Sequence, residues 1–390
     1  MRRAVALLGV VGVAFMVPAA ARATSNATVV FGVDRHVVRF GHEVTFGGQV
    51  ADADSVQQVD VIRRVENRKR LVISDVTVRA DGTFTKAIPV RTPGAFFARA
   101  RVTDNGDQKT IASAERTVAV RPILKTRWRG SRTLGRTAVI RGRVVPRAAG
   151  TLKRTARGRT RTIRLSARGY FRTSFRLDRP RDLSVRLAVV PRARYRGTTR
   201  RMHRDVVLPY LGYGSHGRAV RILERYLAHR QYALPRVNRS YTLTTVQAVW
   251  AFQKVHGLAR TGRVGPRLWR KIGRSHRPRA ILARGSHIEI SKSRQVIFEV
   301  RRGKVVNVLH TSTGATGNTP VGKFHVYWKS PGYNALGMYY SMYFLRGFAV
   351  HGYHSVPPYP ASHGCARIPI WAARGLYYRW GVGTTVRVFG

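Results

Sequence analysis

The stretch that decides the C-terminal fold and its chemistry is Ser362-His363-Gly364-Cys365-Ala366-Arg367. It contains the only cysteine of the 390-residue chain. A cysteine becomes a good nucleophile when an imidazole or a positive field stabilises its thiolate. A glycine before it lets backbone N–H groups come close to a substrate carbonyl. The stretch therefore predicts Cys365 as a nucleophile, with the N–H groups of Cys365 and Gly364 as oxyanion donors.

The predicted base for this cysteine is His351, which lies 14 residues upstream. His363 is a poorer candidate, because the chain between it and Cys365 is too short to bring its ring onto the sulfur. With no carboxylate nearby, a neutral acceptor must orient the imidazole, most simply the backbone carbonyl of Gly352. Arg367 would hold a substrate carboxylate through its planar fork.

The last part of the chain is poor in carboxylates. From Arg279 onward the only acidic side chains are Glu289 and Glu299, far in sequence from the cysteine. Glycosidases of the usual kind need two facing carboxylates and aspartic peptidases need two Asp, so neither chemistry fits this part. Oxygen-rich magnesium and calcium sites are excluded with them.

A zinc site is the main chemical alternative, because imidazole and thiolate groups could supply a tetrahedral set. Its ligands would be His351, His354, His363 and Cys365. Catalytic zinc sites usually also need a general base, and no carboxylate is near. The sequence therefore predicts no metal and no cofactor.

The periodicity of the chain divides it into parts. Residues 284–390 alternate with a period of two, as in Gln295-Val296-Ile297-Phe298-Glu299-Val300, which is typical of strands. Residues 209–274 have the helical period instead, and they predict three helices. The apolar faces of these helices are Val220, Leu223, Tyr226 and Leu227, then Val246, Val249, Trp250 and Phe252, then Leu268, Trp269 and Ile272.

Residues 24–121 and 122–208 contain short strands broken by turns, and their landmarks repeat. The segment from Phe40 to Val50 is echoed 94 residues later, and Ala80-Asp81-Gly82-Thr83-Phe84 is echoed 87 residues later by Ala167-Arg168-Gly169-Tyr170-Phe171. These offsets predict two tandem immunoglobulin-like β-sandwiches. They are interpreted as spacers or adhesive modules, with inert scaffolding as the alternative.

The N-terminus is typical of a signal peptide over residues 1–23. Arg2 and Arg3 precede an uncharged apolar stretch from Ala4 to Val17, and Ala21-Arg22-Ala23 is a small-x-small cleavage site. An uncleaved anchor is the alternative. No later segment is long and apolar enough to span a bilayer. The protein is therefore predicted to be secreted, without a transmembrane segment after cleavage.

The charge is concentrated in the rear of the chain. Residues 1–121 hold 18 basic and 11 acidic side chains, and residues 122–390 hold 54 and 6, or +48 of the total +55. A field of this sign accumulates polyanions such as nucleic acid, anionic lipid or the acidic polymers of a bacterial wall. Export excludes nucleic acid as the partner and leaves anionic wall polymers as candidates.

At this point a family resemblance is specific. His351-Gly352, a short spacer and the stretch from Ser362 to Arg367 resemble the signature of the L,D-transpeptidase catalytic domain. Thr313-Gly314 and Thr319-Pro320-Val321-Gly322-Lys323-Phe324 resemble a further motif of that family, and Tyr339 to Gly347 falls where it carries a lid.

The resemblance implies that Cys365 attacks a peptidoglycan stem carbonyl after the diamino acid at position three. Terminal D-alanine leaves, and the acyl group passes to an amine of a second stem; with water as acceptor the enzyme would be an L,D-carboxypeptidase. The implied site contains two sets of residues. The catalytic set is Cys365, His351, Gly352 and Gly364, and the substrate-binding set is Ser362, His363, Arg367 and Tyr343.

The helical segment resembles the type 1 peptidoglycan-binding domain over about residues 210–273. The motifs include Gly214-Ser215-His216-Gly217, Ala248-Val249-Trp250-Ala251-Phe252-Gln253 and Gly262-Arg263-Val264-Gly265. Where that family often has Asp-Gly before its second and third helices, this chain has Arg239-Ser240 and Thr261-Gly262. The implied partners are peptidoglycan glycan and stem peptides. A wall-binding protein with a degenerate catalytic domain is an alternative, although the intact cysteine motif argues against it.

The sequence thus predicts a multidomain, mainly β protein located at the cell wall. Its predicted parts are a signal peptide (1–23), two immunoglobulin-like β-sandwiches (24–121 and 122–208), a small three-helix peptidoglycan-binding domain (209–274) and a β-rich L,D-transpeptidase catalytic domain (284–390).

Overall fold

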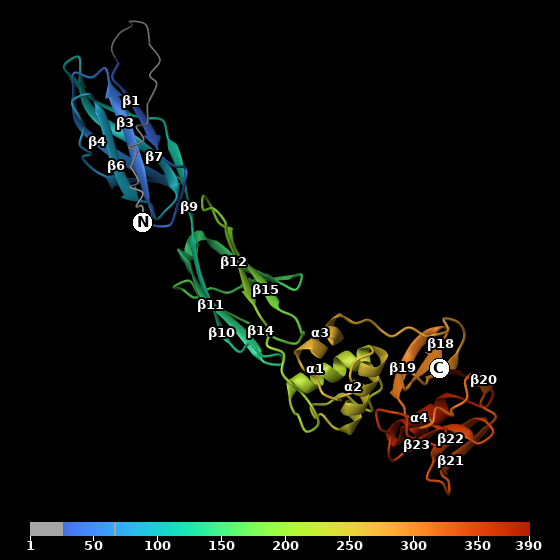
Figure 1. Cartoon of the computed structure of the whole chain (residues 1–390). Coiled ribbons are helices and arrows are strands. Elements are labelled where there is room, and N and C mark those ends of the chain that lie inside the picture. Colours follow the sequence, from blue (N-terminus) through green and yellow to red (C-terminus); the bar gives the residue numbers. More distant parts are fainter. Residues whose placement is uncertain (1–25, 66–67) are drawn as a thin grey trace, which may run out of the picture. The chain divides into compact units, whose positions relative to one another are not determined.

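The computed structural model describes residues 26–65 and 68–390. The predicted signal peptide lies outside the described residues. The described chain divides into two compact units (Figure 1). The first runs to Ile123 and also takes in residues 144–151 and 189–198, and the second contains the remaining residues. Within the described residues, no helix is both long and apolar enough to cross a membrane.

The first unit is a β-sandwich. One sheet has the order β1 (Thr28–Val33), β3 (Glu43–Ala51), β6 (Thr83–Pro89). The other has the order β2 (Val37–Arg39), β9 (Arg116–Arg121), β7 (Gly94–Asp104), β4 (Ser55–Val65), β5 (Arg68–Ile73), with β8 (Asp107–Ala112) also paired to β7. Alternate side chains of both sheets are buried in one apolar core, in which the Phe46 ring lies 5.9 Å from Phe31 and 4.8 Å from Phe96.

A second pair of sheets follows in the chain. The first has the order β10 (Ile123–Gly130), β11 (Thr137–Val145), β14 (Tyr170–Arg176). The second has the order β13 (Arg159–Ile163), β12 (Gly150–Ala156), β15 (Leu183–Pro191), β16 (Thr198–Arg204). A short 3-10 turn, Arg147–Ala149, joins β11 to β12. The β-rich front of the chain therefore consists of two sheet pairs, as the sequence predicts.

The sequence echo has a structural counterpart in two glycines. Gly48 pairs across strands with Phe84, and Gly142 pairs with Phe171. A Cβ on either glycine would lie 2.6 Å from the Cζ atom of its phenylalanine partner, and within 2.3 Å of a backbone carbonyl oxygen. Each phenylalanine ring thus covers a bare glycine backbone, so the repeated Gly and Phe positions carry the same packing in both sheet pairs.

Three helices follow: α1 (Arg218–His229), α2 (Leu243–Val255) and α3 (Pro266–Arg274). Their buried apolar residues include the faces that the periodicity predicts, with Val220, Leu223, Phe252 and Trp269 fully buried. The predicted small helical domain is confirmed.

The C-terminal part contains two sheets and one helix. The first sheet has the order β19 (Lys304–His310), β18 (Val296–Arg301), β17 (His287–Ser291), β25 (Thr385–Phe389), β20 (Gly322–His325). The second has the order β21 (Trp328–Tyr333), β22 (Tyr339–Leu345), β23 (Phe348–Tyr353), β24 (Ala366–Pro369). Helix α4 (Ile370–Arg379) packs in the core with residues of both sheets. The sequence did not predict α4.

Strand β18 is buried on both faces. Ile297 faces the core that α4 shares, whereas Val296, Phe298 and Val300 belong to the apolar core of the three helices. The helices and the β19–β18 edge of the sheet therefore share one continuous core. This explains why β18 is an uninterrupted apolar run apart from Glu299, whose carboxylate is bonded to the Arg379 guanidinium at 2.7 and 2.8 Å.

Candidate active site

Cys365 lies at the start of the last parallel strand pair. It immediately precedes β24, which runs parallel to β23, with His351 paired to Arg367. The cysteine side chain packs with Ala349, Met338 and Tyr343, on the opposite face of the sheet from the α4 core. Its sulfur is 3.6 Å from the Gly347 carbonyl oxygen, and the residue is partly exposed. A substrate can therefore approach the thiol from this face.

His351 lies on the same face of the sheet as Cys365. Ala349, which contacts the cysteine, is two residues before His351 in β23, and side chains two residues apart in a strand share a face. One strand spacing across and two residues along correspond to a Cα separation of about 8 Å. An imidazole on one Cα and a thiol on the other span much of that distance.

The predicted orienting bond of the imidazole is present. His351 Nδ1 is 3.0 Å from the Gly352 carbonyl oxygen, so Nδ1–H donates and the lone pair is on Nε2. Gly352 itself is fixed by packing, because a Cβ there would lie 2.8 Å from the Cβ of Ala373 in α4. The ring is thus held in the tautomer that a general base needs.

The electrostatics favour a neutral pair at rest. Burial, with a smaller contribution from the Arg367 charge, lowers the pKa of His351 to about 4, although the hydrogen bond to the Gly352 carbonyl opposes this. Burial raises the pKa of the Cys365 thiol, although the backbone N–H of Ala349 and the Arg367 charge oppose this. The sequence predicts a stabilised thiolate, whereas the structure favours a thiol beside a neutral imidazole, because desolvation outweighs the positive field.

Ser362 fastens the turn that carries the cysteine. Its hydroxyl donates to the Cys365 carbonyl oxygen at 2.6 Å and accepts from the Gly364 N–H at 3.0 Å. Ser362 is buried, and both of these bonds lie within the turn, so its hydroxyl stabilises the loop. The Gly364 N–H is engaged in this bond, which corrects the expectation that it is free as an oxyanion donor. Of the two predicted oxyanion donors, the Cys365 N–H is therefore the remaining candidate.

Gly364 is required by the shape of the turn. Its φ is +136°, and a Cβ there would lie 2.5 Å from Cε1 of Phe348. Its carbonyl accepts from the Thr319 hydroxyl at 2.6 Å, and Asn318 Nδ2 donates to the His363 carbonyl at 2.8 Å. Thr319, which belongs to the second family motif, and its neighbour Asn318 therefore stabilise the cysteine turn by hydrogen bonds.

The other predicted site residues, Arg367, His363 and Tyr343, differ in exposure and in the groups that they contact. The Arg367 guanidinium stacks 4.1 Å from the Tyr353 ring centroid and donates to the Ala361 carbonyl at 3.1 Å. His363 is exposed at the tip of the turn. Tyr343 is nearly buried, with its ring 4.6 Å from that of Trp328.

The lid expected over residues 339–347 is largely a strand. Residues 339–345 form β22, which pairs with β21 on one side and β23 on the other. Hydrogen bonds to two neighbours fix this segment within the sheet. The lid over residues 339–347 stays a prediction from the resemblance, and any such lid would consist of a paired strand.

The four candidate zinc ligands do not gather. His354 and His363 are exposed, and His354 stacks 4.2 Å from the Tyr353 ring. Within the described chain, three or more ligand atoms come within 4.8 Å of one another only at Asp182, His203 and Asp205, far in sequence from the cysteine. The geometry therefore gives the zinc alternative no support.

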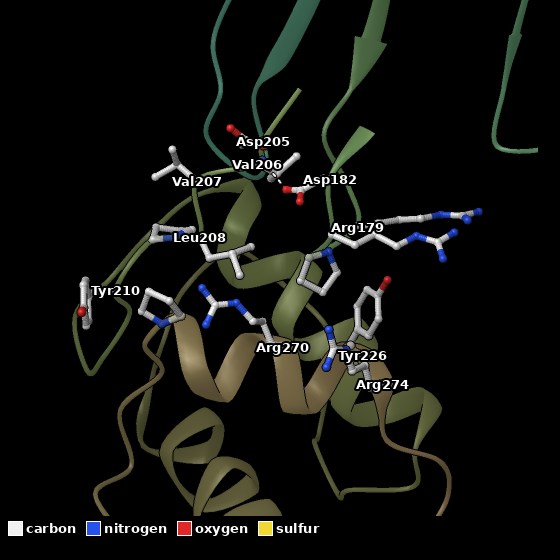
Figure 2. Close-up of a pocket in the computed structure, with 15 residues that line it drawn as sticks. Arg179, Asp182, Asp205, Val206, Val207, Leu208, Tyr210, Tyr226, Arg270 and Arg274 are labelled. Carbon is white, nitrogen blue, oxygen red and sulfur yellow. Dashed lines mark hydrogen bonds between the residues drawn. The ribbon is translucent and has the colours of Figure 1, made fainter. Parts of the chain in front are cut away.

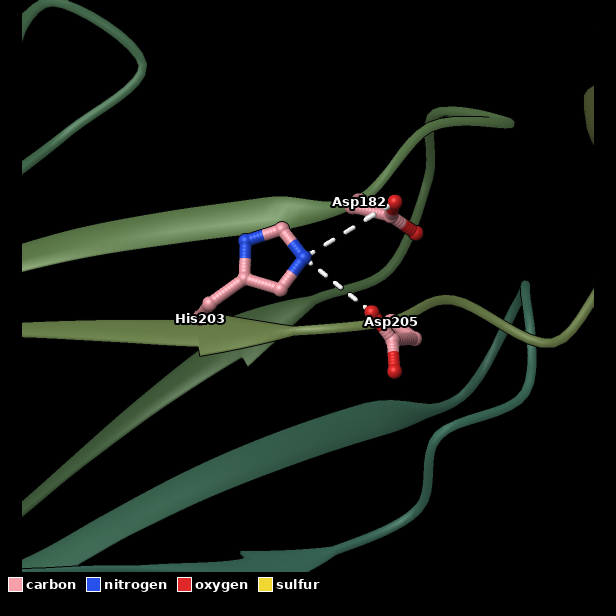
Figure 3. Close-up of side chains that lie close together, drawn as sticks. All are labelled: Asp182, His203 and Asp205. Atoms are coloured by element: carbon pink, nitrogen blue, oxygen red, sulfur yellow. Dashed lines mark hydrogen bonds and ion pairs between the residues drawn. The ribbon is translucent and has the colours of Figure 1, made fainter.

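Asp182, His203 and Asp205 form an exposed surface cluster (Figure 3). His203 Nε2 is 3.1 Å from Asp205 Oδ1 and 3.8 Å from Asp182 Oδ2. Both carboxylates have other partners, since Asp205 pairs with Arg132 at 3.2 Å and Asp182 accepts from the Val206 N–H at 2.9 Å. These bonds account for the cluster without an ion.

An open cavity of about 1060 Å³ lies beside this cluster (Figure 2). It is bordered by Arg270 and Arg274 of α3, Tyr226 of α1, and a strand-end loop that carries Arg179 and Arg181. None of these four arginines makes an ion pair with a carboxylate within the described residues. The cavity is also lined by Asp182 and Asp205 of the cluster, so four arginines face two carboxylates and its lining is positive on balance.

Comparisons with known proteins agree with the cysteine site. Residues 285–388 match the L,D-transpeptidase catalytic domain family, and residues 216–272 match a peptidoglycan binding domain family. The C-terminal part is thus a catalytic domain of the L,D-transpeptidase class, preceded by a peptidoglycan-binding domain.

Solved structures add a relative of high sequence similarity. The crystal structure of the L,D-transpeptidase from Xylanimonas cellulosilytica is 35% identical, and the match covers 46% of this chain and 97% of that one, with a TM-score of 0.45. The chain belongs to the L,D-transpeptidase family.

Two further solved structures match at low identity. A bacterial ice-binding adhesin is 18% identical over 49% of this chain and 68% of that one, with a TM-score of 0.22. A titin fragment is 13% identical over 47% of this chain and 100% of that one, with a TM-score of 0.26. Scores this low add nothing to the description of the front sheets. The comparison with curated protein sequences found no match.

Sequence reasoning missed two buried residues that support the site. Gln295 makes two hydrogen bonds with Thr313. Its Nε2 donates to the Thr313 hydroxyl at 2.6 Å, and its Oε1 accepts from the Thr313 backbone N–H at 2.8 Å. Lys254, near the end of α2, reaches the same region. Its signal in the sequence is a charged residue four positions after Trp250, on a helix that is otherwise uncharged.

Proposed function

We propose that this protein is an exported cell-wall enzyme that remodels peptidoglycan by cysteine-dependent L,D-transpeptidation. One observation carries the proposal: Cys365 and His351 lie on one face of two adjacent parallel strands, with the imidazole Nδ1–H donated to the Gly352 carbonyl. Export rests on the signal-peptide pattern of residues 1–23. The neighbouring peptidoglycan-binding domain supports the same substrate.

In the first half-reaction, Cys365 attacks the carbonyl that follows the diamino acid of a donor stem. Nε2 of His351 accepts the thiol proton as the carbon–sulfur bond forms. The oxyanion is bound by the Cys365 N–H, because the other predicted donor, the Gly364 N–H, is bonded to Ser362. The carbon–nitrogen bond then breaks, and His351 returns the proton to the amine of the departing D-alanine. The product is a thioester on Cys365.

In the second half-reaction, an amine of another stem attacks the thioester. His351 accepts a proton from this amine, the carbon–sulfur bond breaks, and the sulfur recovers the proton. The result is a new amide between two stems and a regenerated thiol. Arg367 is the proposed partner of a stem carboxylate at this site, and Tyr343 and His363 border the substrate. Water in place of the amine would give an L,D-carboxypeptidase.

The test is mass spectrometry of the products that the purified chain forms from a tetrapeptide muropeptide. The expected result is loss of D-alanine together with a cross-linked dimer, because the thioester is transferred to a second stem. Loss of D-alanine with only the tripeptide formed would favour the carboxypeptidase alternative. Unchanged muropeptide from folded protein would contradict the proposed function and would favour a non-catalytic wall-binding protein.

A second binding partner is supported by the cavity of Figure 2. We propose that its arginines bind anionic wall polymers, because a guanidinium fork suits carboxylate and phosphate oxygens and these forks are not ion-paired within the described chain (Figure 2). Tyr226 and Tyr210 also line the cavity. The proposal concerns retention at the wall and is independent of the cysteine chemistry.

The Arg270→Ala/Arg274→Ala double variant should bind polyanions about tenfold more weakly at low salt, with a shallower salt dependence. Titrations with polyphosphate and with poly-L-glutamate distinguish phosphate from carboxylate as the preferred group. The matched control is Arg221→Ala/Arg225→Ala, which removes two exposed arginines from α1 outside the cavity. Equal weakening in both double variants would show non-specific charge attraction and would overturn a site at the cavity.

A further inference from the structure

A lysine of the helical domain is buried inside the catalytic domain. Lys254 lies on α2 and is only 3% exposed. Its Nζ donates to the carbonyl oxygens of Gln295 and Thr311, each at 2.9 Å, and it lies 2.8 Å from Nδ1 of His310. An ammonium has three N–H donors, and here each has one acceptor.

This arrangement is costly and specific. Burying a charge without a counter-ion is unfavourable, and none of the three acceptors of Lys254 is a carboxylate. Burial, with the nearby Arg260 charge, lowers the pKa of Lys254 to about 6, whereas the three acceptors around Nζ favour the protonated form, because only an ammonium can donate to all of them. Burial and the facing lysine also lower the pKa of His310, so its imidazole is neutral; Nε2–H donates to the Val356 carbonyl at 2.8 Å, and Nδ1 accepts. A core of ordinary packing would use an apolar side chain here.

The acceptors of Lys254 begin a hydrogen-bond path toward the nucleophile. Residues 311 and 312 bind the strand after the cysteine, since the Thr311 hydroxyl donates to the Arg367 carbonyl at 2.6 Å. Ser312 exchanges two backbone bonds with Arg367, at 2.9 and 3.1 Å. Lys254 therefore holds residues 311 and 312, and these residues bond to Arg367 of β24.

The path also reaches the residue that fastens the cysteine turn. Gln295, whose backbone carbonyl binds Lys254, holds the backbone and hydroxyl of Thr313 with its amide side chain. The Thr313 carbonyl accepts from the Ser362 N–H at 3.0 Å. Ser362 in turn bonds the Cys365 carbonyl. The two ends of the cysteine turn are thus connected to one ammonium.

We propose that Lys254 is a positioning residue for the Cys365 turn, so that the peptidoglycan-binding domain completes the active site as well as tethering it. The effect on turnover rests on the proposed function, whereas the effect on the position of the sulfur does not. Other contacts hold the two domains together without entering the path: Gln247 Oε1 accepts from Trp371 Nε1 at 2.9 Å, and Arg260 donates to the Pro358 carbonyl at 2.8 Å.

The test compares Lys254→Met with Gln247→Leu in the full chain. Methionine matches the length of lysine but removes all three donors, whereas Gln247→Leu removes an interdomain bond of the same helix outside the path. Two quantities are measured: the rate at which iodoacetamide alkylates Cys365, and kcat and KM for D-alanine release. Thermal unfolding and binding to isolated wall are measured on the same samples.

Lys254→Met is expected to change the alkylation rate and to lower kcat about tenfold, with KM and wall binding nearly unchanged. Gln247→Leu should leave both rates close to wild type. Unchanged alkylation and kcat in Lys254→Met would overturn the proposal, as would equal losses in both variants at equal loss of thermal stability. If Lys254→Met does not fold, Lys254→Gln, which keeps an amide donor on a shorter chain, is judged by the same outcomes.

The two readouts separate this proposal from the proposed function. A wild-type chain that releases no D-alanine would contradict the proposed function, yet the alkylation rate of Cys365 would still report on the position of its sulfur. An active wild type whose Cys365 reacts at the same rate with and without the lysine would leave the function standing and remove the positioning role.

Discussion

Replacement of Cys365 by alanine should lower D-alanine release from a tetrapeptide stem by about 10⁴-fold or more, because no thioester can form without the sulfur. Cys365 is the only cysteine in the chain, so no second thiol can substitute for it. The measurement is the rate of D-alanine appearance by mass spectrometry, with purified chain and a defined muropeptide.

Two controls make this result specific. Wall binding should persist, because the peptidoglycan-binding domain and the arginine-lined cavity are untouched. The unfolding temperature should change little, because Cys365 is partly exposed and loses only one sulfur atom. Full turnover by a well-folded Cys365→Ala chain would refute the assignment of the nucleophile.

Replacement of His351 by alanine should lower kcat by about 10²- to 10⁴-fold, the usual contribution of a general base. The matched control is His354→Ala, three residues along the chain, whose ring is exposed and stacks on Tyr353. His354→Ala should retain most activity. Equal loss in the two variants would contradict the choice of His351.

The same histidine should set the acid limb of the pH profile. The base acts only when it is neutral, and the pKa of His351 is lowered to about 4, so kcat/KM should fall as the pH drops through about 4. An acid limb near 6.5, the ordinary value for histidine, would contradict a buried base. The His351→Ala chain should lack this limb.

Acid unfolding must be measured alongside this profile. Burial lowers the pKa of His256 to about 4 as well as that of His351. In the unfolded chain both histidines bind protons near pH 6.5, whereas in the folded chain they stay neutral until lower pH. The free energy of unfolding therefore decreases as the pH falls from about 6.5 through 4. Circular dichroism at each pH separates this loss from the titration of the base.

The mainly β architecture and the helical domain were predictable because their signals are local. The short apolar run along Val296-Ile297-Phe298-Glu299-Val300 predicts a strand, and the spacing of Val220, Leu223 and Leu227 predicts a helix. Helix α4 escaped this reasoning because Gly375 and bulky aromatic side chains interrupt its pattern. The exact domain boundaries stay predictions.

The candidate site was predictable only in part. The bond from His351 to the Gly352 carbonyl follows from the scarcity of carboxylates, which the sequence displays. The bond from the Gly364 N–H to Ser362 depends on the fold of the turn, and the pairing of Ser312 with Arg367 joins residues 55 apart in the chain. The reach of Lys254 into the neighbouring domain depends on a packing that no local period encodes. Contacts of this range are set by tertiary structure alone.

The core that β18 shares with the three helices has a practical consequence for how the enzyme can be dissected. A fragment beginning at residue 284 would carry Val296, Phe298 and Val300 on an uncovered apolar face, and such faces promote aggregation of recombinant proteins. It would also lack the lysine that fills the acceptors of residues 295, 310 and 311. The smallest sensible piece for crystallisation or inhibitor screening therefore begins before α1, at about residue 209, and keeps the helices with the sheet that they cover.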